Sequence, residues 1–387
     1  MSETPPRERF GRMGRFVKEY TAGLDRRDLR RLFDKDATRA YEVLTRGQHG
    51  QETAPEPKGG CKRFLYRAKL AFLGLSYKLT PARRILFAAS LIAFLLGFVD
   101  DPQVVMTRGK SEWSLDFSPL WFGVSLAMMA YLLALELVDR VRVRDELEVA
   151  RELQEDLLPH DVPPIPGYDF AHSYRTANEV GGDYYDLTPL SDGRISLLVG
   201  DASGHGMAAG LVMAIANATL KTALDLDPAP ERVVDLLNRS LCRTGTKRTF
   251  MSVFYALLDP RTGTMEYVCA GHPFPVLRRA DGTLEELGCG CLPLGMREPL
   301  EVHPETVQLE PGDLVLLYTD GLAEALDSQG REAFGYPRIA ALTGDGGSPR
   351  MVHDRILKAF DRHVGGEPLK DDVTVLIAAR LPPLPVV

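Results

Sequence analysis

Cysteine is scarce in this sequence, and its spacing excludes two common uses of it. The 387 residues contain five cysteines, and no two of them form a Cys-x-x-Cys pair. A zinc site built on such pairs is therefore excluded, and the odd number of thiols argues against a disulfide framework. Cys289 and Cys291 could form a redox pair, but small residues of one loop are the simpler interpretation. Free thiols are typical of a reducing compartment.

Positive charge is also in short supply. The chain has 46 Lys and Arg against 53 Asp and Glu, a net charge of −7, which argues against nucleic acid as a partner of the whole chain. The sequence also lacks a Gly-x-x-x-x-Gly-Lys loop for cradling phosphates. Its length exceeds the roughly 250–300 residues that one core usually supports, so two or more units are expected.

Residues 1–60 are polar and end in GQHGQETAPEPKGG, a composition typical of a linker. Before that, apolar residues stand near helical spacing: Leu29, Leu32, Phe33, Ala40 and Leu44. This periodicity predicts one or two amphipathic helices without visible chemistry. We therefore expect a helical N-terminal region followed by a linker.

Two long apolar runs follow, Ile85–Val99 and Pro119–Val138. A membrane span needs about 20 apolar residues. The second run provides them, and the first comes close if the preceding arginine side chains reach toward the headgroups. A buried hairpin in a soluble domain is the weaker alternative, because neither run has a polar face. Residues 61–138 are thus predicted to be a membrane region, with transmembrane helices at about 82–99 and 119–138.

Basic residues flank these runs and are scarce between them. The intervening loop has only Arg108 and Lys110, whereas more lie outside: Lys62, Arg63, Arg67, Lys69, Lys78, Arg83, Arg84, Arg140, Arg142 and Arg144. The positive-inside rule then places both outer segments in the cytoplasm. The expected location is the inner (plasma) membrane, crossed twice, with the N-terminus and the C-terminal domain in the cytoplasm.

Residues 139–160 predict a linker helix. Its apolar seam has the 4, 3, 4, 3 spacing of a heptad repeat: Val143, Leu147, Ala150, Gln154 and Leu157. Two heptads are fewer than the roughly three or four that identify a coiled coil. The seam fits either a parallel homodimer or packing on the following domain.

From residue 161 to 387, apolar strands alternate with turns and helical stretches. RISLLVG indicates a buried strand, and Asp281-Gly282 is a strong two-residue hairpin turn. Ser348-Pro349 opens a helix for which Gly365 is the expected end. Strands joined by hairpins predict antiparallel sheets with helices on their outer faces, an α+β domain.

Several aspartates stand where predicted strands begin or end: Asp183, Asp201, Asp320, Asp371 and Asp372. One such residue alone usually forms a turn or caps a helix. Strand ends at one rim of a sandwich meet in space, however, and clustered carboxylates need a cation. Oxygen ligands suit Mg²⁺ or Mn²⁺. Two such ions can activate a shared water and clamp a phosphoryl group.

Six blocks in this unit resemble the metal-dependent protein phosphatases of the PP2C type: EVGGDYYD, LLVGDASGHGMAAGLVMA, FMSVFYALLDPRTGTMEYVCAGHPFPVL, LPLGM, LVLLYTDGLAEA and DDVTVLIAAR. They are most similar to the bacterial sporulation and stress-response branch (SpoIIE-type, RsbU-like). The resemblance covers about residues 153–381. Gly181-Gly182-Asp183 also resembles the Gly-Gly-Asp-Glu-Phe signature of cyclic-dinucleotide synthases, but Tyr184-Tyr185 follow instead of an acid and Phe.

The resemblance implies an α-β-β-α sandwich of two antiparallel sheets flanked by helices, and two Mn²⁺ or Mg²⁺ ions. The residues that match metal ligands are Asp183, Asp201 as the bridge, the carbonyl of Ala202, Asp320 and Asp371. Asp372 is an alternative to Asp371. His205 matches a general acid or a cap at the start of the 205–224 helix, and both interpretations stay open. We find no match for the arginine that holds substrate phosphate in the eukaryotic branch.

The family implies hydrolysis of phosphoserine or phosphothreonine on a protein, in this branch usually a phosphorylated anti-sigma-factor antagonist. The expected function is therefore a membrane-anchored protein phosphatase, with the helix 139–158 passing a signal to the metal site. The main alternative is a non-catalytic module of the same fold that binds a partner at the membrane. The intact set of acids speaks against that alternative, and a nucleotide cyclase has no support beyond the Gly-Gly-Asp triplet.

Overall fold

The computed structural model describes residues 60–99, 104–108, 111–115, 117–159, 164–204, 206–244 and 249–382. The helices predicted within residues 1–59 lie outside the described residues. The chain divides into two compact units, Met1–Arg140 and Val141–Val387.

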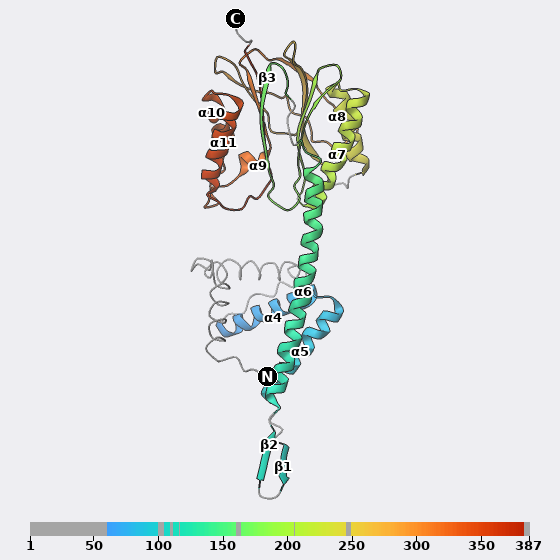
Figure 1. The fold of residues 1–387 in the computed structure, drawn as a ribbon, viewed down its shortest axis with the longest axis vertical. Helices are drawn as coiled ribbons and strands as arrows, with labels where there is room; N and C mark the ends of the chain where they lie inside the picture. Colours follow the sequence, from blue (N-terminus) through green and yellow to red (C-terminus); the bar gives the residue numbers. More distant parts are fainter. Residues whose placement is uncertain are drawn as a thin grey trace, which may run out of the picture. The chain divides into compact units, whose positions relative to one another are not determined.

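The described part of the first unit consists of helices and a small hairpin (Figure 1). Helix α4 (Gly60–Lys78) is followed by α5 (Pro81–Val99). Strands β1 (Val104–Arg108) and β2 (Ser111–Leu115) pair in antiparallel fashion. Helix α6 (Ser118–Glu155) begins after them and contains the boundary between the units.

Helices α5 and α6 contain the two apolar runs. Among the described residues, three helices are long and apolar enough to cross a membrane, namely α5, α6 and α7 (Met207–Leu226). The apolar face of α7 is buried in the second unit. In contrast, α5 and α6 expose large apolar side chains, such as Ile85 and Leu126 at 72% each. Lipid-facing helices require such a surface, so the two predicted spans stay a prediction that the structure accommodates.

The second apolar run and the predicted linker helix form one element. Helix α6 continues through residue 138 without a break, because no glycine or proline occurs between Gly123 and Pro159. The N-terminal end of its heptad seam is exposed, whereas the C-terminal residues pack against the rest of the second unit. Val143 is 56% exposed, whereas Gln154 is 5% exposed and Leu157 packs against the core of the second unit. Domain packing thus explains the C-terminal part of the seam, and a homodimer stays a prediction for the rest.

The second unit contains two five-stranded sheets in which all neighbouring strands are antiparallel. The first sheet, in the order β10-β7-β6-β5-β4, consists of β4 (Asp183–Pro189), β5 (Ile195–Ala202), β6 (Met251–Asp259), β7 (Thr264–Ala270) and β10 (Glu305–Gln308). The second sheet, in the order β3-β12-β11-β8-β9, consists of β3 (Tyr168–Arg175), β8 (Val276–Arg278), β9 (Leu284–Glu286), β11 (Leu314–Tyr318) and β12 (Val373–Arg380).

Helices cover both outer faces, as Figure 1 shows. Helices α7 and α8 (Pro230–Thr244) lie on the first sheet, and α9 (Asp320–Glu324), α10 (Tyr336–Gly344) and α11 (Pro349–Val364) lie on the second. One apolar core fills the space between the sheets and under α7 and α8, and another lies under α10 and α11. The α-β-β-α sandwich expected from the sequence is therefore confirmed.

Helix α11 shows how local sequence sets the bounds of these elements. The Ser348 hydroxyl accepts a hydrogen bond from the Met351 N–H, and proline occupies the first turn. The helix ends at Gly365, whose φ of 65° is left-handed. Both ends agree with the sequence prediction.

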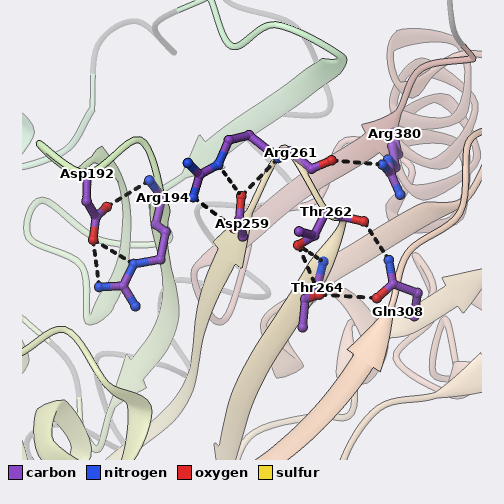
Figure 2. Close-up of polar contacts among 8 residues, drawn as sticks. All are labelled: Asp192, Arg194, Asp259, Arg261, Thr262, Thr264, Gln308 and Arg380. Carbon is purple, nitrogen blue, oxygen red and sulfur yellow. Dashed lines mark hydrogen bonds and ion pairs between the residues drawn. The ribbon is translucent and has the colours of Figure 1, made fainter.

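At one rim of the sandwich, called here the turn rim, two acids at hairpin turns each pair with an arginine two residues away (Figure 2). Asp192 pairs with Arg194 at 2.7 Å, and Asp259 pairs with Arg261 at 3.1 Å. Hydrogen bonds from these arginines lower the pKa of both aspartates. Arg380 of the second sheet donates to the Arg261 carbonyl at 3.4 Å, so a hydrogen bond also joins the two sheets at this rim.

Candidate metal centre

Asp183 and Asp201 lie directly opposite each other on β4 and β5, at the end of the first sheet away from the turn rim. The preceding Gly182 lets the two strands meet there. A Cβ on Gly182 would lie 2.9 Å from the Ala202 carbonyl oxygen and 3.3 Å from Asp201 Oδ1. Glycine therefore allows an approach of backbone to carboxylate that a side chain would block.

The second sheet brings further acids to the same end. Asp320 begins α9 two residues after the last residue of β11, and Asp371 and Asp372 directly precede β12. A Cβ on Gly321 would overlap the Asp372 carbonyl and lie 3.4 Å from Asp371 Cβ, so these two segments touch. The charges of all three acids act on the Asp201 carboxyl. We call this end the acid rim, made of Asp183, Asp201, Asp320, Asp371 and Asp372.

The acid rim differs from the turn rim in its electrostatics. Burial raises the pKa of Asp183 well above its ordinary value, and the neighbouring Asp201 charge raises it further. Burial, followed by the charges of the three acids from the second sheet, raises the pKa of Asp201. The pKa of Asp320 is also raised, mainly by burial. Aspartates at the turn rim, in contrast, have lowered pKa values, and no described lysine or arginine appears among the causes of the pKa shifts of Asp183, Asp201 and Asp320.

The acid rim fits a divalent cation. Within the described part of the chain, Asp320 Oδ1 is buried without a hydrogen-bond partner. Carboxylate and carbonyl oxygens are the donors that Mg²⁺ and Mn²⁺ prefer. In the same described part, no three His, Cys, Asp or Glu side chains already surround one point as metal ligands would. Binding would therefore require the carboxylates to turn toward a common centre.

Two threonines from the second sheet hold Asp183. The hydroxyls of Thr319 and Thr374 donate to Asp183 Oδ2 over 2.7 and 2.6 Å. The Thr374 N–H donates to the Thr319 hydroxyl oxygen at 3.0 Å, and all three side chains are buried. These bonds occupy one carboxylate oxygen, so Oδ1 is the oxygen of Asp183 that a cation can use.

Asp372 and Asp371 have different surroundings. The two carboxylate oxygens of Asp372 accept hydrogen bonds from the backbone N–H groups of Ala177, at 2.7 Å, and Gly182, at 2.5 Å. Asp372 is buried, whereas Asp371 is exposed. A carboxylate engaged with two backbone donors is the poorer candidate for a ligand, so the geometry favours Asp371.

Gln154, in the last turn of α6, clamps the backbone just before Asp183. Its Oε1 accepts from the Gly181 N–H at 2.9 Å, and its Nε2 donates to the Gly181 carbonyl at 2.6 Å. Gly181 has no room for a side chain, because a Cβ would overlap the Tyr174 hydroxyl and come 2.5 Å from Asp372 Oδ2. The end of α6 is thus bonded to the Gly-Gly-Asp segment.

Most of the site residues predicted from the sequence come together. Those at the acid rim are Asp183, Asp201, Ala202, Asp320 and Asp371, and their roles as ligands stay predictions. His205 lies outside the described residues. Thr319, Thr374 and Gln154 were not predicted. The available signals were a threonine beside aspartate in YTDG and DDVT, and a polar residue at an apolar seam position.

Replacing Thr319 or Thr374 by valine should weaken Mn²⁺ binding about 10-fold or more, because groups that orient a metal ligand contribute that much to affinity. Serine at either position should restore the affinity. Isothermal titration calorimetry of residues 141–387 measures the effect. Thr343→Val, which removes a buried hydroxyl of α10 bonded to Ile339, is the matched control. Equal weakening in this control would contradict the assignment.

Gly181→Ala should destabilise the second unit by about 1–3 kcal/mol, the usual cost of overpacking. The added methyl group would meet the Tyr174 hydroxyl, so adding Tyr174→Phe should recover part of the loss. Thermal unfolding measures both. Gly344→Ala is the control, since its Cβ would make an ordinary 3.5 Å contact with Leu284. An unfolding midpoint of Gly181→Ala equal to that of this control would show that the clash is not real.

Known proteins are similar to the second unit in both sequence and fold. Residues 191–381 match the family described as Stage II sporulation protein E (SpoIIE). Protein IcfG of Synechocystis is 24% identical over an alignment of 277 residues that covers 64% of this chain and 43% of that protein. Phosphoserine phosphatase RsbU of Bacillus subtilis is 26% identical over 245 residues, 62% of this chain and 71% of that protein. The chain thus spans less than half of IcfG.

Two solved structures agree. The SiaA-PP2C domain of Pseudomonas aeruginosa has a TM-score of 0.55 at 20% identity, covering 63% of this chain and 99% of that chain. The RsbU and RsbW domains of a Mycobacterium tuberculosis protein have a TM-score of 0.51 at 31% identity, covering 59% of this chain and 64% of that chain. Together with the sandwich of two antiparallel sheets, these similarities show that the C-terminal part of the chain is a SpoIIE family domain with a PP2C-like fold.

Proposed function

We propose that this chain is a metal-dependent phosphatase that hydrolyses phosphoserine or phosphothreonine on a regulatory protein. The observation that carries the proposal is the acid rim, where both sheets contribute carboxylates and burial raises the pKa values. Two similar proteins of Bacillus subtilis, RsbU and RsbP, are named phosphoserine phosphatases. The chain spans 71% and 47% of them, so their activity supports the proposal by similarity alone.

The proposed ligands of two Mn²⁺ or Mg²⁺ ions are Asp183, Asp201, the carbonyl of Ala202, Asp320 and Asp371. Asp201 suits the bridging position because it faces Asp183 across the strand pair and the acids of the second sheet also act on it. Asp371 is preferred over Asp372, whose oxygens accept backbone hydrogen bonds.

The chain's own residues would prepare the site for such ions. Bound ions of this kind lower the pKa of a coordinated water and neutralise phosphoryl oxygens. Buried acids without a counterion favour cation binding, and Thr319 and Thr374 fix the carboxylate of Asp183.

His205 is our candidate for the general acid that protonates the leaving serine oxygen. The alternative role, a cap near the start of the following helix, also stays a prediction, since α7 begins at Met207, two residues after His205.

We further propose that α5 and α6 anchor the protein in the plasma membrane, with the N-terminus and the phosphatase domain in the cytoplasm. The exposed apolar side chains of both helices support this. The proposed substrate is a phosphorylated anti-sigma-factor antagonist, the usual substrate class of the branch that the sequence resembles.

The contact between Gln154 and Gly181 supports a regulatory role for α6. Two hydrogen bonds join the last turn of this helix to the segment that carries Asp183. A rotation or shift of α6 that breaks them would release Gly181 and disturb Asp183. The helix could transmit such a movement as a monomer or as a homodimer paired through its exposed seam residues.

A non-catalytic module of the same fold, binding a partner at the membrane, is the rival function. Such a module has no need for a complete set of acids, whereas all five aspartates are present at the acid rim. Metal binding distinguishes the two functions, since only the phosphatase requires it.

Asp201→Asn should lower Mn²⁺-dependent hydrolysis of p-nitrophenyl phosphate by about 100-fold or more, because losing a ligand costs more than losing a group that orients one. Asp192→Asn, at the turn rim, is the matched control and should keep full activity. Residues 141–387 are suitable for the assay. Activity without Mn²⁺ or Mg²⁺, or an active Asp201→Asn variant, would remove the two-metal proposal.

The metal-free second unit should lose stability as pH rises from about 6.5 to about 8. Burial raises the pKa of Asp201 to about 8, so the folded state keeps a proton that the unfolded state releases above about pH 4. The free energy of unfolding therefore falls with pH until the folded carboxyl ionises. Acids with lowered pKa values, such as Asp192, act only below about pH 4. Burial lowers the pKa of His272 to about 3. Its titration therefore changes the free energy of unfolding only below about pH 6.5, the ordinary pKa of histidine.

Thermal unfolding in a chelator, between about pH 6.5 and 8, tests this pH dependence. Asp201→Asn should raise the unfolding midpoint of the metal-free protein, because it removes one buried charge, and should reduce the increase that Mn²⁺ produces. A parent protein whose metal-free midpoint rises with pH in this range would contradict the expectation.

A further inference from the structure

Helix α4 is strongly basic in an acidic protein. Its 19 residues include no Asp or Glu, and its basic residues are Lys62, Arg63, Arg67, Lys69 and Lys78. The whole chain has a net charge of −7. The proposed phosphatase reaction does not use this helix, and α4 is not among the described helices apolar enough to span a membrane. Neither the proposed reaction nor the proposed membrane spans therefore explain the charge of this helix.

A fixed corner joins α4 to the beginning of α5. The Arg84 guanidinium donates to the carbonyls of Ser76, at 2.9 Å, and Leu79, at 3.3 Å, so it caps the C-terminal end of α4. The rings of Phe72 and Phe87 stack with centroids 5.5 Å apart. Figure 1 shows α4 running across the line of the apolar part of α6 rather than along it.

An ionic cluster marks the level at which the two apolar helices end. Arg83, in the first turn of α5, lies 3.0 Å from Glu136 and 2.7 Å from Asp139 of α6. The start of α5 and the end of the apolar part of α6 are therefore side by side. If these helices span a bilayer, their charged ends lie at its surface, and α4 leaves the bundle at that level.

We propose that α4 lies in the headgroup layer of the cytoplasmic leaflet and binds anionic phospholipids. The proposal rests on the proposed membrane anchoring by α5 and α6. Lysine and arginine side chains beside a span attract anionic headgroups, and the positive-inside rule places this end of the hairpin on the cytoplasmic side.

Side-chain exposure favours a lipid surface over an acidic protein as the partner. Phe72 and Leu75 are 39% exposed and Tyr77 is 68% exposed, on a helix whose Lys69 and Lys78 are also exposed. A helix with both basic and apolar or aromatic side chains at its surface suits the boundary between headgroups and acyl chains. An acidic protein would use the charges and leave the apolar side chains without a partner.

Hydrogen–deuterium exchange of the full-length protein in lipid nanodiscs tests the proposal. One set of discs contains phosphatidylcholine alone, and the other contains phosphatidylcholine mixed with phosphatidylglycerol. We expect the amides of residues 60–78 to exchange severalfold more slowly in the anionic discs. The four-residue variant K62Q/R63Q/R67Q/K69Q should lose this difference.

The matched control removes the same number of positive charges from the second unit, R232Q/R297Q/R350Q/K358Q, and should keep the difference. Unchanged exchange in β5 and β12 shows that each variant is folded. Equal exchange of α4 in both kinds of disc, a difference that survives in the α4 variant, or protection that needs an added acidic protein would overturn the proposal. A protein that elutes apart from the discs but hydrolyses p-nitrophenyl phosphate would overturn the anchoring as well, without affecting the phosphatase proposal.

Discussion

The bonds from Thr319 and Thr374 to Asp183 hold the two sheets together at the acid rim. Asp183 begins β4 in the first sheet. In the second sheet, Thr319 directly follows β11 and Thr374 lies near the start of β12. A buried carboxylate is unfavourable unless it is hydrogen-bonded or paired, and here the two hydroxyls meet part of that need. The strand pairing then fixes Asp201 opposite Asp183. The geometry of the candidate centre depends on this single carboxylate.

The two rims of the sandwich solve the same electrostatic problem in opposite ways. At the turn rim, arginines two residues away neutralise Asp192 and Asp259. At the acid rim, the acids converge from distant parts of the chain, and burial raises their pKa values. The fold can evidently supply a local arginine at a hairpin turn. The buried acids at the other rim, with their raised pKa values, are therefore the main support for the proposed cation site.

Local patterns made much of this predictable from the sequence, and long-range contacts explain what was missed. Glycine beside aspartate at strand ends identified the acids, and the strand pattern and turns identified the sandwich. Thr319 and Thr374 meet Asp183 across 136 and 191 residues, a distance over which no periodicity extends. Gln154 has the spacing of a heptad seam residue, and spacing alone cannot reveal that its side chain bonds to Gly181. The expected boundary at residue 138 reflects a change in polarity, which does not interrupt a helix that has no glycine or proline near that residue.

The clamp between Gln154 and Gly181 affects where the chain can be cut. Gly181 is buried, and both its N–H and its C=O form hydrogen bonds with the Gln154 side chain. Buried backbone groups without partners are unfavourable, so a fragment beginning after residue 154 would expose this defect at the base of β4. A stable fragment of the phosphatase domain therefore has to begin within α6 and include its last turns, which are part of the folded domain.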